Sequence, residues 1–337
     1  MSLGTTAGVD WDRRKADWRA ACFAPLWESS AHSPTPGARP GQQWRWSDIR
    51  RFAHEAAQLT SPGIVERRVL RLVNPAPLSE RDESTVGNLA AAIQILLPGE
   101  CARPHRHSIN ALRFVLEGVG ATTVVNGKPV EMHVGDMLLT PGGCWHEHFH
   151  SGKEPVIWLD ALDAPVHNLL GISTFQSGPA VDVPPTISDS AFRSPNILPS
   201  LAGEGWPYSP VGRYPYEDIV RALEHAPVGR DGTRSVRYVN PLTGGAVLSS
   251  IDCRMVALEP GHSSSDYRSN ASVVCLVVEG EGETRLDERS FGWSKHDIFT
   301  IPPGTWSRHG ARTPARLLQV SDREMLRRLD FFEEFYR

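Results

Sequence analysis

Residues 98–149 read PGECARPHRHSINALRFVLEGVGATTVVNGKPVEMHVGDMLLTPGGCWHEHF and carry the strongest pattern in the chain. Six of the thirteen histidines of the protein lie in this stretch or directly after it. His105 and His107 are two residues apart, so in a β-strand both imidazoles point to the same face. His146 follows a turn and a second predicted strand, 137–140. Three neutral imidazoles that converge from two strands would bind a divalent first-row metal and leave other coordination positions open.

Turn residues frame the three histidines. A single His-x-His pair arises by chance in many chains and is weak evidence alone, but here turn positions occur at fixed distances around it. These positions are Gly99, Glu117-Gly118, Gly135-Asp136 and Pro141, and the last two precede Trp145-His146. The pattern resembles the two sequence motifs of the cupin family, with His105, His107 and His146 in the metal-ligand places. The carboxylate ligand usual in that family is absent, because its region reads Asn-Ala-Leu-Arg at 110–113.

The composition excludes several functional classes. A length of 337 residues is enough for two domains, and 40% hydrophobic with 22% charged residues is typical of a soluble globular protein. A net charge of −4 and a pI near 6.4 give no electrostatic case for binding nucleic acid or an anionic membrane. The sequence shows no apolar run long enough for a membrane span and no signal core, so we expect no membrane association.

The five cysteines, at positions 22, 101, 144, 253 and 275, form no CxxC motif and no even framework. They are typical of reduced thiols, and we expect a cytoplasmic protein. Cys144 lies beside the predicted site. We expect a buried small side chain rather than a nucleophile there, because no separate base remains once the histidines bind metal.

The segment 1–63 is predicted to be a helical N-terminal arm. A helix fits 11–28, a Pro/Gly/Ser-rich loop follows it, and a second helix, 48–59, can be capped by Ser47. The aromatic residues of this arm suit packing on a barrel or on a neighbouring subunit.

From residue 64 the pattern changes to short β-rich runs with turn signals, among them the hairpin turn Asn126-Gly127. This pattern predicts a jelly-roll barrel over 64–170, which would carry the metal site and catalysis. Residues 171–210 are rich in Pro and Ser, and the segment 171–230 is predicted to be a linker with one short helix, 216–225.

A second β-rich region, 231–337, is a degenerate copy of the first and ends in a predicted charged helix over 322–336. KHDIFTIPPGTWSRH at 295–309 aligns with VGDMLLTPGGCWHEH at 134–148. The repeat replaces the three predicted ligands by Tyr267, Ser269 and Ser307, a set that would not hold ferrous iron or zinc.

The sequence therefore predicts an all-β bicupin, with two jelly-roll β-barrels in tandem, a helical N-terminal arm and a short C-terminal helix. The second barrel is expected to be metal-free. Its remaining histidines lack the paired strand spacing and are expected to be solvated or structural: His262, His296 and His309.

Arg113 points to the substrate. A metal held by three neutral histidines keeps its double positive charge and favours a ligand with a carboxylate beside a hydroxyl, with room left for dioxygen. Arg113 is eight residues after His105 and shares its parity, so on a continuous strand it would face the same side. A guanidinium inside a barrel is costly unless it meets an anion. The alternative is a bulge that turns Arg113 to solvent.

Other polar residues could line the same cavity. His148 is two residues after His146, and Asp160 lies on the following strand, where it could orient a histidine or accept a proton. Gln94 and the pair Arg67-Arg68 precede them on earlier strands, and the sequence leaves open which of the two arginines faces the cavity.

The residues around the predicted site resemble those of a smaller group within the cupin family. The segments ERRVLRLVNP, AIQILLPGE, PHRHSINALRFVLEG, CWHEH and IWLDALD are similar to those of gentisate 1,2-dioxygenase and its relatives, the salicylate and 1-hydroxy-2-naphthoate dioxygenases. The resemblance implies one Fe(II) per chain in the N-terminal barrel and a homotetramer. It also implies cleavage by O2 of a small aromatic carboxylate, between the carboxyl-bearing and the adjacent hydroxyl-bearing carbons.

By the same resemblance, His105, His107 and His146 ligate iron. Arg113, Gln94 and an arginine of the 67/68 pair would hold the carboxylate, His148 and Asp160 would be catalytic, and Trp158 would be a pocket wall. Ala90 and Ala92 stand where many relatives carry a large aromatic, and Arg71 where an apolar residue is usual. Smaller walls suggest a bulkier ring, such as a halo- or nitro-substituted gentisate or salicylate.

Other classes stay open at this point. A cupin isomerase acting on a sugar or keto acid would use the same metal but has no need of Arg113. A metal-free binding cupin is excluded only if the three histidines converge. The sequence leaves open the ring substituents, the oligomer number and the choice between iron and manganese.

Overall fold

The computed structural model describes residues 13, 16, 20, 40–65, 67–75, 84–194, 196–200 and 207–337. The chain divides into two compact units, 1–38 and 39–337. In the first unit only Arg13, Ala16 and Ala20 are described, and all three are helical. The rest of the predicted helix 11–28, and the loop after it up to residue 39, lie outside the described residues.

Two antiparallel sheets build the first barrel. The six-stranded sheet has the order β12-β8-β5-β10-β3-β2 and the five-stranded sheet the order β11-β4-β9-β6-β7. The strands of the larger sheet are β2 (Val69–Arg71), β3 (Ala90–Leu96), β5 (Ala111–Glu117), β8 (Met137–Thr140), β10 (Val156–Leu162) and β12 (Arg213–Tyr214). Those of the smaller sheet are β4 (Cys101–His107), β6 (Ala121–Val125), β7 (Lys128–Met132), β9 (His146–His150) and β11 (Phe175–Ser177). The apolar core between them joins Val115 and Trp158 of the larger sheet to Met132 of the smaller one.

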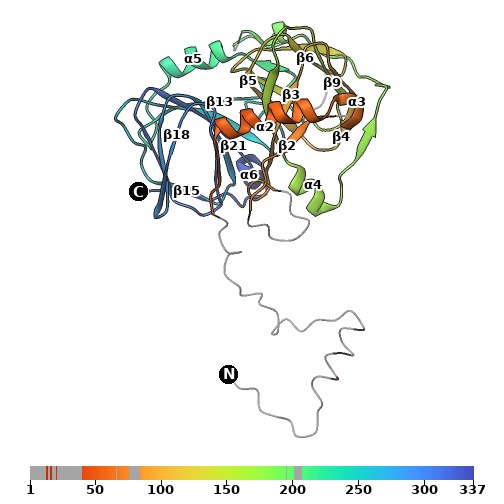
Figure 1. Ribbon diagram of the computed structural model, residues 1–337. Helices are drawn as coiled ribbons and strands as arrows, with labels where there is room; N and C mark the ends of the chain where they lie inside the picture. The colour runs from red at the N-terminus through yellow and green to blue at the C-terminus, as the bar shows by residue number, and fades with distance from the viewer. Residues whose placement is uncertain are drawn as a thin grey trace. The chain divides into compact units, whose positions relative to one another are not determined.

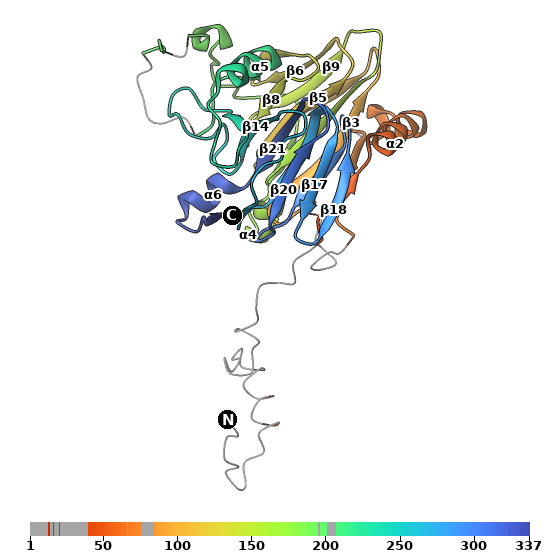
Figure 2. The same cartoon turned by 90° about the vertical axis from the view of Figure 1, so that its left-hand side faces the viewer.

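The second barrel repeats this arrangement with sheets β1-β19-β16-β21-β14-β13 and β18-β17-β20-β15-β22. Its first sheet consists of β1 (Gln43–Trp44), β13 (Arg234–Arg237), β14 (Asp252–Leu258), β16 (Val273–Glu279), β19 (Ile298–Ile301) and β21 (Ala315–Ser321). Its second sheet consists of β15 (Tyr267–Ser269), β17 (Gly282–Leu286), β18 (Arg289–Trp293), β20 (Ser307–Ala311) and β22 (Glu334–Tyr336). Figure 2 shows β17, β18 and β20 of this barrel in blue. The predicted bicupin fold is confirmed.

The largest apolar core lies between the two barrels, where the six-stranded sheets pack back to back. Leu112, Phe114 and Leu116 of β5 belong to this core, together with Leu276 of β16 and Leu318 of β21. Because side chains alternate along a strand, the intervening residues of β5 face the interior of the first barrel. One sheet thus joins the barrels with one face and faces the interior of the first barrel with the other.

The N-terminal arm bridges both barrels (Figure 1). Strand β1 pairs with β19 of the second barrel, and helix α2 (Trp46–Leu59) buries Ile49 and Ala53 in the core between the barrels. The predicted cap at Ser47 is wrong, because the helix begins at Trp46 and its N-cap is Arg45. The backbone N–H of Trp46 donates instead to Oδ1 of Asp297 in the second barrel at 2.8 Å.

Residues 171–230 do more than connect the barrels. After helix α4 (Ala164–Leu170), they contribute edge strand β11 on β4, a short 3₁₀ helix (Asp189–Phe192) and edge strand β12 on β8. The predicted helix 216–225 is present as α5 (Tyr216–His225). The sequence did not predict these edge strands, because segments of two or three residues show no periodic pattern.

The turn between β6 and β7 agrees with the prediction, whereas the C-terminal helix is shorter than predicted. Asn126 and Gly127 both have positive φ and join β6 to β7, as predicted. The predicted helix 322–336 is wrong in extent: α6 spans Arg323–Arg328, and the chain then forms β22 against β15. Asp330 has a positive φ of 59°, which a continuing helix does not allow. A further short helix is α3 (Pro62–Val65). Within the described ranges, none of the helices has both the length and the apolar character of a membrane span.

Candidate active site

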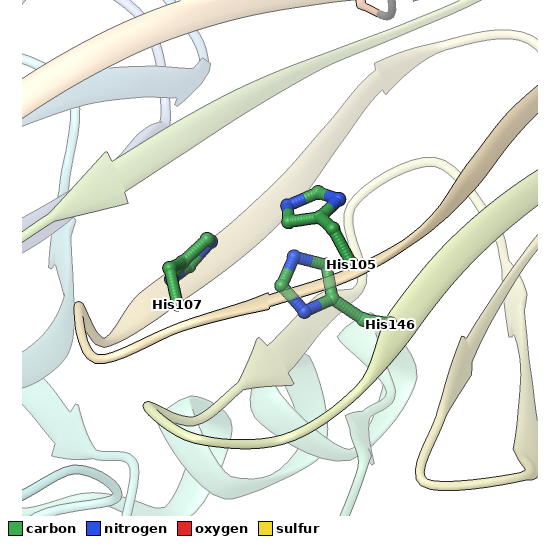
Figure 3. A group of neighbouring side chains, drawn as sticks. All are labelled: His105, His107 and His146. Atoms are coloured by element: carbon green, nitrogen blue, oxygen red, sulfur yellow. The ribbon is translucent and has the colours of Figure 1, made fainter. Parts of the chain in front are cut away.

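Three histidines converge at the mouth of the first barrel. His105 and His107 lie at the end of β4, and His146 opens β9 directly opposite His105. Figure 3 shows their rings turned toward one another from two strands. Their ring centroids are 4.2 Å (His105–His146), 4.8 Å (His107–His146) and 5.3 Å (His105–His107) apart, and one ligand atom from each lies within 4.8 Å of the others. The three histidines therefore converge as predicted. Their convergence argues against a metal-free binding cupin.

The donor set suits a divalent first-row metal. His107 Nδ1 is 2.8 Å from the carbonyl of Ile109, and His146 Nδ1 is 3.0 Å from the carbonyl of Cys144. A neutral imidazole that donates from Nδ1 leaves Nε2 as a lone pair for a metal. Burial, followed by the charge of Arg67, lowers the pKa of His105 to about 2, and burial also lowers the pKa of His107 and of His146. The rings are thus held in the neutral form that binds a metal.

No carboxylate joins this group among the residues that the structure describes. Asn110, which stands near the usual position of that ligand, is held by Asp163. Its backbone N–H and its Nδ2 donate to the two carboxylate oxygens at 2.8 and 2.9 Å. The three neutral histidines would therefore leave the double positive charge of a bound divalent cation uncompensated.

Arg113 faces the barrel interior and forms an ion pair with Asp160. The two residues are register partners on β5 and β10, and Nε of Arg113 is 2.9 Å from Oδ1 of Asp160. The strand pairing is regular from Ala111 to Phe114, so the alternative of a bulge that turns Arg113 outward is wrong. Both side chains are almost fully buried, and burial raises the pKa of Asp160 while Arg113 opposes that shift. The pairing itself was not predicted.

Asp160 gathers two further side chains. Its Oδ2 accepts a hydrogen bond from Gln94 Nε2 on β3 and another from Trp158 Nε1 at 3.2 Å. A buried carboxylate is stable only when it is paired and hydrogen-bonded, and here both conditions are met. Gln94, Arg113, Trp158 and Asp160 thus form one network on three adjacent strands.

His148 lies deeper than the three histidines. Its ring centroid is 6.2 Å from that of His146 and 5.5 Å from that of Trp158. Its Nδ1 is 2.9 Å from Thr123 Oγ1, its register partner on β6, and its Nε2 has no hydrogen-bond partner in the described part of the chain. Burial holds the pKa of His148 well below its usual range. Thr123 was missed, since nothing in the sequence reveals which β6 residue lies opposite His148.

The structure distinguishes Arg67 from Arg68. Nη2 of Arg67 contacts Nδ1 of His105 and donates to the carbonyl of Arg103 at 3.1 Å. Arg68 instead donates to the carbonyl of Ala57 at the end of α2 at 3.2 Å, and it forms an ion pair with Glu100. Arg67 therefore lies at the candidate site, and Arg68 on the opposite side of the chain.

The remaining pocket positions lie on β2, β3 and β11. Ala90 and Ala92 share the inward parity of Gln94, and Arg71 is the register partner of Ala92. Phe175, within the predicted linker, stacks on His105 with centroids 5.1 Å apart. Sequence reasoning missed it, because only the pairing of β11 with β4 brings it there.

Cys144 is buried, and its thiol is 3.4 Å from the hydroxyl of Tyr208. Burial raises the pKa of this thiol, so it stays protonated at neutral pH. This environment agrees with a packing role rather than a nucleophilic one.

The second barrel keeps the strands without the ligands. Tyr267 is the register partner of Ser307, as His105 is of His146. No second group of possible metal ligands occurs in the described ranges. His309 is buried, His296 packs edge-on against Trp46 at 4.9 Å, and His262 is exposed. The second barrel thus repeats the strand pairing of the first without its three histidines, as the sequence repeat predicted.

Comparison with known proteins decides the family. Residues 92–162 match the cupin domain model. Gentisate 1,2 dioxygenase 1 of Aquipseudomonas alcaligenes is 35% identical over 324 residues, which cover 93% of this chain and 92% of that protein. The chain belongs to the gentisate and salicylate 1,2-dioxygenase family of ring-cleaving bicupin enzymes. The predicted family resemblance is thus confirmed.

Other members of the family agree. The 5-aminosalicylate 1,2-dioxygenase of Comamonas sp is 33% identical over 348 residues, with 99% of this chain and 92% of that protein covered. The crystal structure of salicylate 1,2-dioxygenase from Pseudoaminobacter salicylatoxidans with gentisate has a TM-score of 0.91 and 30% identity, over 100% of this chain and 96% of that one.

We expect one divalent metal ion per chain, held in the first barrel. His146→Ala should lose the metal, because two imidazoles do not replace three. Ser307→Ala changes the corresponding position of the second barrel and should keep it. Elemental analysis after anaerobic loading with Fe²⁺ and desalting measures both. Two ions per chain, or full loading of His146→Ala, would contradict the assignment.

Proposed function

We propose that this enzyme is an Fe(II)-dependent dioxygenase of gentisate or a related ortho-hydroxybenzoate. It would cleave the ring between the carboxyl-bearing and hydroxyl-bearing carbons and incorporate both atoms of O2. The observation that carries the proposal is the group of three neutral histidines beside two inward arginines, Arg67 and Arg113. Salicylate and 1-hydroxy-2-naphthoate are alternative substrates. An isomerase of sugars or keto acids is disfavoured, because it needs no such arginines beside an apolar wall.

His105, His107 and His146 would hold the iron, which when bound supplies sites for the substrate oxygens and for dioxygen together with redox chemistry. The chain's own contribution is electrostatic. Three neutral ligands and two guanidinium groups give the site a strong preference for an anion. A carboxylate next to a hydroxyl meets this preference and can chelate in a bidentate manner.

Arg67 and Arg113 would hold the carboxylate end of the substrate. Arg67 contacts the ring of His105, and Arg113 keeps Nη1 without a hydrogen-bond partner among the described residues, although Nε faces Asp160. Asp160 and Gln94 fix the position of the Arg113 guanidinium. A guanidinium fixed in this way binds a planar carboxylate with little further loss of freedom.

His148 would serve the proton chemistry, and Asp160 would position the groups that bind the substrate. If Nδ1 of His148 donates to Thr123, its unpartnered Nε2 presents a lone pair to the pocket, and the lowered pKa keeps that lone pair available at neutral pH. Such a group can accept the proton of a substrate hydroxyl. Asp160 acts through Arg113 and Gln94 and orients the carboxylate end.

The aromatic ring would lie between Trp158 and the alanines of β3. Ala90 and Ala92 carry small side chains on the face of β3 that carries Gln94, and Arg71 is the register partner of Ala92. We expect these small side chains to admit a substituted ring, including a halo- or nitro-substituted gentisate or salicylate. Phe175 would add an apolar wall on the side of His105.

Oxygen uptake by protein loaded with Fe²⁺ tests the proposal. We expect one O2 consumed per molecule of gentisate, 5-aminosalicylate or salicylate, with an ultraviolet rise from the ring-opened product. 3-Hydroxybenzoate, which lacks the ortho hydroxyl, serves as the control and should be inert. Failure with every ortho-hydroxybenzoate would contradict the proposal, and conversion of a sugar or keto acid without O2 would support an isomerase.

Steady-state kinetics should separate three residues. Arg67→Met removes a charge that binds the carboxylate and should raise KM by about tenfold or more, a charge-assisted contact being worth ~2 kcal/mol or more. His148→Ala should lower kcat by about 10²-fold or more with a smaller change in KM. Arg68→Met, the matched control, should leave KM within about twofold. Equal effects of Arg67→Met and Arg68→Met would refute the placement of Arg67.

We also propose a cytoplasmic homotetramer. The four described cysteines are free, which suits a reducing compartment. Large apolar side chains are exposed around β11, namely Leu169, Leu170, Ile172 and Phe175. Exposed apolar groups of this density mark subunit contacts. Analytical ultracentrifugation should give four times the chain mass of 37.2 kDa, and a stable monomer at micromolar concentration would rule the tetramer out.

A further inference from the structure

The second barrel has an open cavity, lined by both polar and apolar residues, although it lacks the metal ligands. The cavity has a volume of about 260 Å³, far above the roughly 10–15 Å³ that one water needs by the same measure. Arg254, Tyr267, Ser269 and Gln319 line it, and the exposed Glu334 stands at its rim. β15 and the marked C-terminus lie beside each other at this edge of the barrel (Figure 1).

A chain of hydrogen bonds fixes the polar groups inside. Trp293 Nε1 donates to Thr284 Oγ1 at 2.9 Å, and His309 Nδ1 lies 2.8 Å from the same oxygen. Gln319 Nε2 is 3.3 Å from His309 Nε2, and Arg254 Nε donates to Gln319 Oε1 at 2.6 Å. Since tryptophan and arginine only donate, one arrangement satisfies every contact: His309 is neutral with its proton on Nδ1. Arg254 is thus held in place by its Nε.

Arg254 occupies a different electrostatic setting from Arg113 in the first barrel. Arg113 on β5 forms an ion pair with the carboxylate of Asp160 on the neighbouring strand β10. The corresponding strand of the second barrel carries the amide of Gln319, which pairs in register with Cys275 on one side and with Arg254 on the other. In the second barrel the amide of Gln319 stands where the first barrel has Asp160, and the arginine lies on β14, on the opposite side of Gln319 from Cys275.

The carboxylates around the cavity are already engaged. Asp252 faces Arg237 at 2.6 Å and Arg323 at 3.6 Å, and Glu334 accepts from the hydroxyl of Tyr267 at 3.0 Å. Asp231 accepts from the backbone and hydroxyl of Thr233. Within the described ranges, no carboxylate forms an ion pair with Arg254, whose guanidinium lies 5.6 Å from the ring of Tyr267.

We propose that this cavity binds a small organic monocarboxylate through the Nη groups of Arg254, with the hydroxyl of Ser269 nearby. A planar guanidinium with its Nε fixed presents two parallel N–H donors, which match a carboxylate. The apolar residues Val236, Ala271 and Val273 line the same cavity and suit an apolar body. The neighbouring Asp252 and Glu334 disfavour a doubly charged phosphate. This site needs no metal and goes beyond the proposed function.

Calorimetric titration with benzoate, and with the neutral benzamide as ligand control, tests the site. Gln319→Glu restores a carboxylate opposite Arg254, and Arg254→Gln removes the charge. Each should weaken one benzoate-binding event by about tenfold or more. Arg308→Gln, which removes an exposed arginine from the adjacent β20, should leave this event unchanged. Benzamide should not bind there.

Arg67→Met serves to separate the two barrels, because the event assigned to the second barrel should survive in it. Unchanged benzoate binding in Gln319→Glu and Arg254→Gln would overturn the proposal, as would equal weakening by Arg308→Gln. If Arg254→Gln fails to fold by its melting curve, Gln319→Glu decides alone, since it keeps the arginine. Absence of oxygen uptake by the wild-type enzyme would count against the proposed function only.

Discussion

The structure depends on the two-sided burial of β3, β5 and β10. One face of these strands packs against the second barrel, and the other face lines the candidate site. A shift of one residue in the register would exchange Phe114 with Arg113 and place a charge between the barrels. The apolar contact between barrels therefore fixes the orientation of the polar residues on the opposite face. The second barrel, without the group of three histidines, still has this task, because it supplies the other side of the inter-barrel core.

The charge distribution of the site follows from that arrangement. Arg67 approaches from the segment before β2 and Arg113 from β5, and Asp160 forms an ion pair with Arg113. Burial together with these cations keeps His105, His107, His146 and His148 neutral. The same potential that disfavours protons on the imidazoles favours an anionic ligand. One set of charges thus serves both the ligand state of the histidines and the selection of a carboxylate.

Much of the fold and part of the site could be predicted from the sequence, for identifiable reasons. Spacing along one strand is a local property, so the shared face of His105 and His107 followed directly. Arg113 faces inward as predicted, but it lies on β5 and not on the strand of His105, so the assumption of one continuous strand was wrong. Pairing between strands is not local. The partnership of Arg113 with Asp160, the contact of Thr123 with His148, and the approach of Phe175 to His105 all depend on register. Composition also hid the short edge strands, since two or three residues carry no periodic signal.

The position of the N-terminal arm has a consequence for how the molecule comes together. Gln43 pairs with Phe299, and Trp46 donates to Asp297, so the partners are about 250 residues apart in the chain. During synthesis the first barrel emerges complete, except for these contacts, while the residues that receive the arm are still to be made. The back face of its six-stranded sheet, with Phe114 and Leu116, stays uncovered over the same interval. Such non-local closure is slow and leaves apolar surface accessible to other chains. The pairing of β1 with β19 can therefore form only after the second barrel has been made.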